Sequence, residues 1–488
     1  MVTSGRLPKE LALLRAKVAS SILRVLRIEG SSMIKITKFG GSSVSSAGQF
    51  KKVKAIVQAD PSRRFVVVSA AGKRDKFDSK ITDLLYLVNA HLQYHVTCDD
   101  LLGTIGQRFC EIAKELNLSY PISQEFGIFR ELAKRGEYTP EYIVSRGEYF
   151  TGRMMAEYLG FPFVDAADVI TFRPDSSIDM DKTAEKLKAA IGEEKCFVLP
   201  GFYGATEDGK IKLLDRGGGD ITGAIVAQCL GADLYENWTD VSGFLTADPR
   251  IVDNPKSISR ITYAELRELS YMGASVLHEE AIFPVKDAGI PLVIKNTNAP
   301  DDPGTVISEE TEPGVAEPLI TGIAGKKDFI AIHVKTNHMS SKVGYIRKTL
   351  SIFERYRVSI EHIPTGIDSF AVVVQGSDVK DCLYSIVADI KSELEPDEIK
   401  IVDRLALIST VGRNMPSRPG TSGRLFGELG HAGINIRMIA QGSEELDIVV
   451  GVDVDDFERA IRVIYGAFVD SDDNIITVEE AEEEATKE

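Results

Sequence analysis

From about residue 33 to residue 315, runs typical of β-strands alternate with segments of helical periodicity such as 79–92 and 221–231. The strand-like runs end in glycines or other small residues, as in 63–72 (RRFVVVSAAG), 195–204 (KCFVLPGFYG), 232–243 (ADLYENWTDVSG) and 290–298 (IPLVIKNTN). This alternation predicts an α/β fold with an open, largely parallel and buried sheet. Ligands of such sheets bind beyond the carboxyl ends of the strands, where this sequence has its small residues.

The first strand-to-helix connection is rich in glycine and serine. The segment IKITK (34–38) alternates like a short strand, the glycines of KFGGSSV (38–44) end it, and Ser45-Ser46 are suited to cap a helix that begins near Gly48. Unpaired N–H groups and the dipole at a helix N-terminus favour phosphate. The segment is therefore a phosphate cradle or an ordinary glycine turn, and local pattern does not decide between them.

A second connection of the same kind is Arg216-Gly217-Gly218-Gly219-Asp220. Its glycines allow the backbone to approach a ligand closely, and Asp220 is placed to hold Mg²⁺ or orient phosphates. Arg216 is suited to pair with a substrate carboxylate. The preceding GATEDGK (204–210) has P-loop spacing, but Ile211 replaces the required Ser or Thr and a strand follows, so we interpret it as a hairpin turn.

Two other segments contain candidate residues. In SRGEYFTGRMMAEYLG (145–160), Glu148 follows a glycine at the expected start of an apolar helix, where it is either a ligand-binding carboxylate or a partner of the helix dipole. The segment WTDVSGFLTADPR (238–250) combines an aromatic residue, a Thr-Asp pair and a turn; its alternative interpretation is a strand and a loop.

Composition excludes several classes of protein. The 488 residues are 43% hydrophobic and 27% charged, with a formal net charge of -16, and allow two or three domains. An acidic chain without a basic stripe is a poor nucleic-acid binder, and no apolar run is long enough to span a membrane. The five cysteines are scattered, which favours reduced thiols and a cytoplasmic location and provides no zinc site.

The two ends of the chain differ from the rest. Residues 1–32 form a basic amphipathic pattern, which we interpret as an N-terminal extension, with a targeting peptide as the alternative. The fold is therefore expected to begin near Met33. Residues 476–488 are strongly acidic and are expected to be a disordered tail.

An internal repeat follows a linker at 307–322 that is rich in prolines and acidic residues. At an offset of 76 residues, Gly344 matches Gly420, and Phe353 matches Leu429. Each copy is predicted to consist of a strand, a glycine turn, a helix and a further strand. Paired units of this size are typical of effector-binding modules, and a purely structural dimerisation domain is the alternative.

Taken in order, KFGGSSV, VVSAAGK, SRGE, RGGGD, WTDVSGFLTADPRIV and MGASVLH resemble the aspartate kinase family from about Ile34 to Phe468. The resemblance implies an amino-acid kinase α/β/α sandwich followed by two α+β, ferredoxin-like ACT units. The expected domains are a catalytic domain at 33–310 and ACT domains at 319–395 and 396–475. The implied activity is transfer of the ATP γ-phosphoryl group to the β-carboxylate of L-aspartate, the first step of lysine, threonine and methionine biosynthesis.

The resemblance also implies roles for individual residues. Lys38 would bridge the transferring phosphoryl group, and Asp220 would organise Mg²⁺ and the phosphates, with no direct protein cluster for the metal. Aspartate would be bound by Ser69, Thr82, Glu148, Arg216 and Gly219, with Glu148 on the α-ammonium and Arg216 on the α-carboxylate. Nucleotide contacts would come from Lys38, Gly40, Gly41, Ser42, Thr239, Asp240, Leu245, Arg250, Ser275 and Val276.

The β-carboxylate of aspartate is already a nucleophile at pH 7, so positioning and charge neutralisation are the expected catalytic tasks. Two departures from the family pattern affect that expectation. Gly219 stands where the family commonly has serine, and Ser275 where it commonly has lysine. We therefore expect weaker or water-mediated substrate binding at Gly219 and one doubtful nucleotide contact at Ser275.

By resemblance, an amino-acid effector would bind at a dimer interface in the first ACT unit, at Met339, Tyr345, Ile346, Ile360 and Glu361. The same resemblance favours lysine, with Glu361 paired to its side-chain ammonium, and threonine is the alternative because such modules bind it in related enzymes. The structural alternative is that Ile346 and Ile360 are core residues and Glu361 is solvated. A homodimer or higher homo-oligomer is expected. Alternative functions are a sister kinase acting on glutamate and a catalytically impaired amino-acid sensor.

Overall fold

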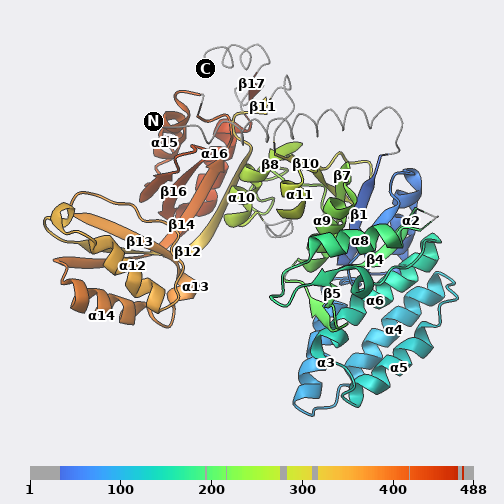
Figure 1. Cartoon of the computed structure of the whole chain (residues 1–488). Coiled ribbons are helices and arrows are strands. Elements are labelled where there is room, and N and C mark those ends of the chain that lie inside the picture. The colour runs from blue at the N-terminus through green and yellow to red at the C-terminus, as the bar shows by residue number, and fades with distance from the viewer. Residues whose placement is uncertain are drawn as a thin grey trace, which may run out of the picture. The chain divides into compact units, whose positions relative to one another are not determined.

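The computed structural model describes residues 33–192, 195–215, 217–274, 283–309, 317–416, 418–470 and 475–476 (Figure 1). The predicted N-terminal extension (1–32), Arg216, Ser275, Val276 and residues 477–488 of the predicted acidic tail lie outside these ranges. The chain forms two compact units. Unit 1 comprises the chain up to Ser242 together with Glu280–Asp302, and unit 2 comprises Gly243–Glu279 together with the chain from Pro303.

Unit 1 is built on a parallel sheet, as the alternating pattern predicts. Its strands lie in the order β4 (Phe197–Pro200), β2 (Phe65–Val68), β1 (Lys35–Phe39), β7 (Leu234–Thr239) and β9 (Leu292–Asn296). β2 and β4 are buried along their whole length, and β1 along all but its first residue. The carboxyl ends of these strands therefore meet at one edge of unit 1.

Helices cover both faces of this sheet. One face packs against α2 (Ala47–Ala59), α3 (Ile81–Gln93), α4 (Asp99–Glu115), α5 (Ile122–Lys134) and α6 (Pro140–Leu159), in one continuous hydrophobic core. On the other face, α9 (Gly218–Leu230) packs against β1 and β7, with α8 (Met180–Ala190) and α11 (Phe283–Asp287) beside it. The expected α/β/α layering is confirmed. Figure 1 shows α3 to α6 as the blue to green group of helices.

The predicted hairpin at 204–210 is present. β5 (Tyr203–Thr206) and β6 (Ile211–Leu213) pair antiparallel, and Gly209 in their turn has a φ of 79°. A short strand β3 (Thr171–Phe172), preceded by α7 (Ala166–Val169), completes this small sheet. Helices α4 and α5 and strand β3 were not predicted from the sequence.

The expected start of the helix that carries Glu148 is wrong. α6 begins at Pro140, with the Thr139 side chain accepting a hydrogen bond from the Tyr142 N–H, so Glu148 lies in the middle of the helix. A Cβ on Gly147 would lie 2.9 Å from the Ala70 Cβ. The glycine therefore permits close packing of α6 on the β2–α3 connection and does not mark a helix start. Glu148 is therefore too far from the N-terminus of α6 to be a partner of the helix dipole.

In unit 2, β8 (Arg260–Thr262) pairs parallel with β10 (Thr305–Ser308), and α10 (Tyr263–Tyr271) follows β8. A capping box formed by Thr262 and Glu265 starts α10. The buried Glu265 carboxylate also accepts from the Arg413 guanidinium at 2.6 Å. A strand pair of β11 (Glu317–Pro318) with β17 (Ile475–Ile476) completes this part of the unit.

The rest of unit 2 contains a five-stranded antiparallel sheet covered by helices, here called the C-terminal sheet. Its order is β13 (Ser369–Gln375), β12 (Gly322–Lys335), β14 (Glu398–Val411), β16 (Asp447–Asp453) and β15 (Met438–Gln441). The helices are α12 (Tyr345–Arg355), α13 (Gly376–Val379), α14 (Leu383–Leu394), α15 (Thr421–His431) and α16 (Phe457–Phe468). Short 3-10 turns lie at Met339–Ser341 and Val454–Asp456.

The predicted repeat is visible in the helices that begin the two halves. Gly344 and Gly420 precede α12 and α15, have φ values of 76° and 94°, and each leads into a helix of 11 residues. Long strands β12 and β14 run side by side through both halves (Figure 1). Leu319, Ile320 and Ile323 belong to the core of the second half, and Ile399 packs against that of the first. The domain bounds expected at 395 and 396 stay a prediction.

Candidate active site

The first glycine-rich connection is a tight turn anchored to β7. The Gly40 N–H donates to the Trp238 carbonyl at 2.9 Å, and the Ser43 hydroxyl lies 2.7 Å from the Thr297 hydroxyl. A short 3-10 turn (Gly41–Val44) leads into α2, which Ser46 caps as predicted. A Cβ on Gly41 would lie 2.9 Å from the Ala70 carbonyl oxygen, so this position accommodates only a bare backbone. The turn therefore lies at the carboxyl ends of β1, β2 and β7.

Lys38 and Asp220 form an ion pair beside this turn. Lys38 is buried on β1, and Asp220 lies in the first turn of α9, which Gly217 starts with a φ of 85°. Asn237 donates to Asp220 Oδ1 at 2.9 Å, and the Tyr235 hydroxyl donates to the Asp220 main-chain oxygen at 3.0 Å. The Asp220 side chain is 15% exposed and is accessible to a ligand.

Ser69 and Gly219 lie at the same place. A Cβ on Gly219 would be 2.7 Å from the Ser69 hydroxyl and 3.5 Å from the Lys38 side chain. The missing side chain at residue 219 thus leaves room that the Ser69 hydroxyl occupies. The structure brings together the predicted residues Lys38, Ser69, Gly219 and Asp220.

Glu148 is a buried carboxyl group on α6, with 4% of its surface exposed. Burial raises its pKa to about 8, although a hydrogen bond from the Ala70 N–H opposes the shift. Its Oε2 atom has no hydrogen-bond partner among the described residues. The nearby Arg146 guanidinium instead stacks on Tyr142 and Tyr149, 4.1 and 4.4 Å from their ring centroids. Glu148 is therefore able to accept a cationic ligand group.

Helix α3 faces the same region. Burial raises the pKa of Tyr86 on α3, and the charge of Glu148 adds to this shift. Thr82, one turn earlier, is half-buried. The connection before α3 is held by Arg108 of α4, which donates to the Gly72 carbonyl at 2.5 Å and the Ser79 carbonyl at 2.6 Å. Arg108 was missed from the sequence because nothing in its local pattern distinguishes it from a solvated helix residue.

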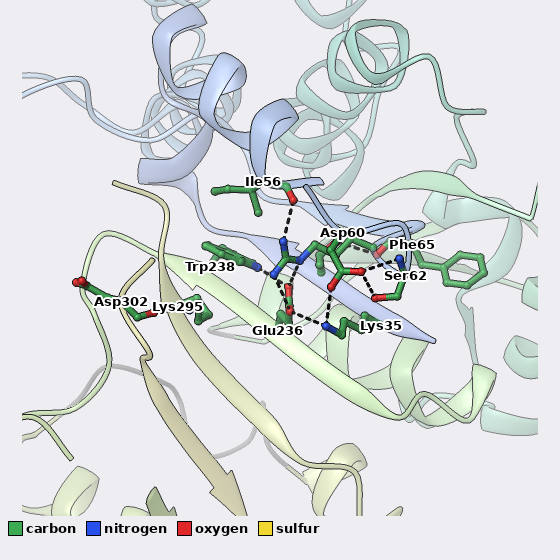
Figure 2. Close-up of polar contacts among 11 residues, drawn as sticks. Lys35, Ile56, Asp60, Ser62, Phe65, Glu236, Trp238, Lys295 and Asp302 are labelled. Atoms are coloured by element: carbon green, nitrogen blue, oxygen red, sulfur yellow. Dashed lines mark hydrogen bonds and ion pairs between the residues drawn. The ribbon is translucent and has the colours of Figure 1, made fainter. Parts of the chain in front are cut away.

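The opposite face of β1 and β7 holds a second polar group, shown in Figure 2. Arg63 binds Glu236 through two hydrogen bonds of 2.8 and 3.1 Å, and the Trp238 indole N–H donates to Glu236 at 2.9 Å. Lys35 pairs with Asp60 at 2.7 Å. These contacts fix Trp238, whose carbonyl anchors the glycine turn, without reaching the Lys38 side of the sheet.

The remaining predicted nucleotide residues are divided between the two units. Thr239 is the last residue of β7 in unit 1 and Asp240 follows it, and their side chains are joined by a hydrogen bond of 3.1 Å. Leu245 and Arg250 belong to unit 2, where Arg250 is exposed and pairs with Asp248 at 2.6 Å. Arg216, Ser275 and Val276 lie outside the described residues.

The predicted effector residues gather in the first half of the C-terminal sheet and its helices. Met339 and Tyr345 are buried members of its core, and Ile346 and Ile360 pack against that core, partly buried. The Glu361 carboxylate accepts a hydrogen bond of 2.6 Å from Tyr271, the last residue of α10. Glu361 is therefore not simply solvated.

Asp220 is suited to bind a metal only together with a phosphate ligand. The described residues contain no cluster of three or more His, Cys, Asp or Glu side chains that could hold a metal. Mg²⁺ in kinase sites is commonly bound by one or two carboxylates plus substrate phosphates, and Asp220 beside the glycine turn fits that donor set. Within the part of the chain that the structure describes, no helix is long and apolar enough to cross a membrane.

Two models of known protein families match parts of this sequence. Residues 33–296 match the model of the Amino acid kinase family, and residues 408–468 match an ACT domain model. Aspartokinase 3 of Bacillus subtilis (strain 168) is 35% identical over 449 residues, which cover 89% of this chain and 98% of that protein.

Solved structures of aspartate kinases are also similar to this chain. Clostridium acetobutylicum aspartate kinase is 47% identical, with a TM-score of 0.84 over 90% of this chain and 100% of that one. E. coli aspartokinase III is 25% identical in two structures. One, with aspartate and ADP (R-state), has a TM-score of 0.68 over 89% of this chain and 99% of that one. The other, with lysine and aspartate (T-state), has a TM-score of 0.70 over 90% and 100%.

Proposed function

The chain belongs to the aspartokinases of the amino acid kinase family, and on this premise we propose that it transfers the γ-phosphoryl group of ATP to the β-carboxylate of L-aspartate. The observation that carries the proposal is the meeting of Lys38, Ser69 and Asp220 at the carboxyl ends of β1, β2 and the start of α9. The product is 4-phospho-L-aspartate.

The reaction needs little covalent help from the protein. The substrate carboxylate is ionised at pH 7, so it attacks without a general base. The Lys38 ammonium neutralises charge on the transferring phosphoryl group, and the N–H groups of Gly41 and Ser42 in the glycine turn accommodate the phosphates. Asp220 would hold Mg²⁺, which when bound with ATP neutralises the phosphate oxygens.

Aspartate is oriented by groups of opposite charge. Glu148, buried and with one oxygen unpartnered among the described residues, receives the α-ammonium. A buried carboxylate without a charged partner is costly in free energy, so the Glu148 site favours a ligand with a positively charged group. Ser69 and Thr82 supply hydroxyl groups near the substrate. Arg216, which lies outside the described residues, is proposed for the α-carboxylate from family resemblance alone.

We further propose that the C-terminal sheet is regulatory and that it binds lysine at Glu361, with threonine as the alternative effector. The E. coli structure with lysine is similar to this chain over 90% of its length, which supports the choice. Tyr271 already donates to the Glu361 carboxylate, so a side-chain ammonium would compete for the same acceptor. Dimerisation through the ACT sheets and a cytoplasmic location stay predictions.

The decisive experiment is an ATP-dependent assay in which the acyl phosphate is trapped as a hydroxamate. Aspartate and glutamate are compared, each with and without lysine or threonine. We expect turnover of aspartate, little of glutamate, and inhibition by lysine. Absence of aspartate turnover would refute the proposed activity, and turnover of glutamate alone would favour the sister kinase.

A further inference from the structure

We propose that Asn237 is a positioning residue that sets the orientation of the Asp220 carboxylate opposite Lys38. Neither the sequence motifs nor the family resemblance assigns a role to this residue. The predicted changes in rate rest on the proposed kinase activity. The predicted changes in the free energy of unfolding do not depend on it.

The strand register places Asn237 beside Lys38. Lys38 of β1 and Asn237 of β7 are direct partners in the parallel pairing, as are Ile36 and Tyr235. Partners in register point to the same face of a sheet, and here that face packs against α9. Glu236 and Trp238 point to the opposite face, where Arg63 and Lys35 bind (Figure 2). Asn237 is therefore separated from that polar group and directed at Asp220.

Two donors converge on one oxygen of the Asp220 carboxylate. The Lys38 ammonium and the Asn237 amide both reach Asp220 Oδ1. None of the described residues donates a hydrogen bond to Asp220 Oδ2. Two donors on one oxygen fix the rotation of the carboxylate and leave the other oxygen for a ligand.

An amide side chain at residue 237 is buried in the interior of the sheet. Asn237 is 3% exposed, next to Ile294 as its register partner on β9. A buried amide is unfavourable unless it is hydrogen-bonded, so an apolar residue would suit this strand better if packing were the only requirement. A polar residue in the interior of a parallel strand was the one sequence signal that could have revealed Asn237.

The rate experiment compares Asn237→Leu and Asn237→Asp with the wild-type chain. Leucine keeps the approximate volume and removes the donor, so we expect kcat to fall about 10- to 100-fold, the loss typical of a hydrogen bond to a charged group, with a smaller change in KM for aspartate. Thr37→Val is the matched control. Thr37 is equally buried on β1, but it points to the other face and donates to the Phe65 carbonyl at 3.2 Å. The kcat of the Thr37→Val variant should therefore equal that of wild type.

Asn237→Asp gives a signature that a merely structural role would not produce. A protonated aspartic acid donates to Asp220 as the amide does, whereas an ionised one repels it. The charged or titratable groups that face position 237 are Lys38 from β1, Asp220 from α9 and Tyr235 from its own strand; Ile294 on β9 is apolar. We expect this variant to approach wild-type kcat at low pH and to lose at least tenfold more activity than wild type as pH rises.

A double-mutant cycle provides a test that does not depend on activity. The free energy of unfolding is measured for wild type, Asn237→Asp, Asp220→Asn and the double variant between pH 5 and 9. We expect Asn237→Asp to destabilise increasingly with pH and Asp220→Asn to cancel that dependence. Any one of three results would overturn the proposal: additive effects in the cycle, equal kcat values for Asn237→Leu and wild type, or parallel pH profiles of the two Asn237 variants. If the wild-type chain does not phosphorylate aspartate, the proposed function is refuted. The unfolding cycle then still tests whether Asn237 positions the Asp220 carboxylate.

Discussion

Lys38 on β1 and Asp220 in the first turn of α9 form an ion pair that joins the two glycine-rich connections of the chain. Each connection alone resembles an ordinary turn. Together they place an ammonium, a carboxylate and the backbone N–H groups of a helix start at one edge of the sheet of unit 1. That arrangement is what phosphoryl transfer to a carboxylate requires.

Replacement of Lys38 by Met should reduce kcat about 10²- to 10³-fold, because a group that neutralises transition-state charge is lost. Lys38→Arg should retain part of the activity. Lys35→Met is the matched control: it removes an ammonium from the same strand, but that ammonium pairs with Asp60 on the opposite face. Steady-state kinetics at saturating ATP and aspartate measures the effect. Full activity of Lys38→Met would exclude the assigned role.

Much of the fold follows from local pattern in the sequence. The parallel strands, the Ser46 cap, the hairpin at Gly209 and the glycines before α12 and α15 all depend on residues within a few positions of one another. Such features have local physical causes, namely periodicity, capping and positive φ. They were therefore predictable without tertiary information.

The supporting contacts of the site were not predictable in this way. Asn237 and Asp220 meet only because β7 and α9 pack together, and Arg108 reaches Gly72 only because α4 packs near the β2–α3 connection. The start of α6 was missed because Gly147 serves a packing contact with Ala70 and local pattern does not show this. Register and helix packing decide these contacts.

The KM for aspartate should fall as pH rises from 6 to about 8, if Glu148 binds the substrate ammonium. The pKa of Glu148 is raised to about 8 by burial, so below that pH binding must first remove a proton. The apparent KM should therefore change by about tenfold per pH unit below the pKa and level off above it. Glu148→Gln should have a high KM without this dependence. A wild-type KM independent of pH would contradict the binding role.

The same group should make folding stability depend on pH in the absence of substrate. The folded-state pKa is raised from 4.5 to about 8, so the folded chain binds more protons than the unfolded chain between these values. The free energy of unfolding should fall as pH rises through this window, by at most about 1.4 kcal/mol per pH unit from this group. Glu148→Gln should lack this contribution. Denaturant unfolding of both proteins at pH 5, 6.5 and 8 measures the difference.

Gly72→Ala should disrupt the glycine turn. A Cβ at residue 72 would lie 2.5 Å from the Gly41 carbonyl carbon and 2.8 Å from the Ser42 nitrogen. We expect a loss of about 1–3 kcal/mol in stability from overpacking and a raised KM for ATP. Gly127→Ala in α5 is the control, because a Cβ there meets nothing within 4 Å and should stabilise the helix by about 0.5–1 kcal/mol. Unchanged ATP binding by a folded Gly72→Ala protein would show that this turn does not contact the nucleotide.

Tyr271→Phe should make the enzyme more sensitive to lysine. The Tyr271 hydroxyl donates to the Glu361 carboxylate at 2.6 Å, which a lysine side chain would also need. Removing this competitor is worth about 0.5–1.5 kcal/mol, so the half-inhibitory lysine concentration should fall roughly 2- to 10-fold, with kcat in the absence of effector unchanged. Threonine has no side-chain ammonium, so inhibition by threonine should not change. Glu361→Gln should weaken lysine inhibition whether or not Tyr271 is present. An unchanged or weaker response of Tyr271→Phe to lysine would mean that the Glu361 carboxylate is not the acceptor for the effector.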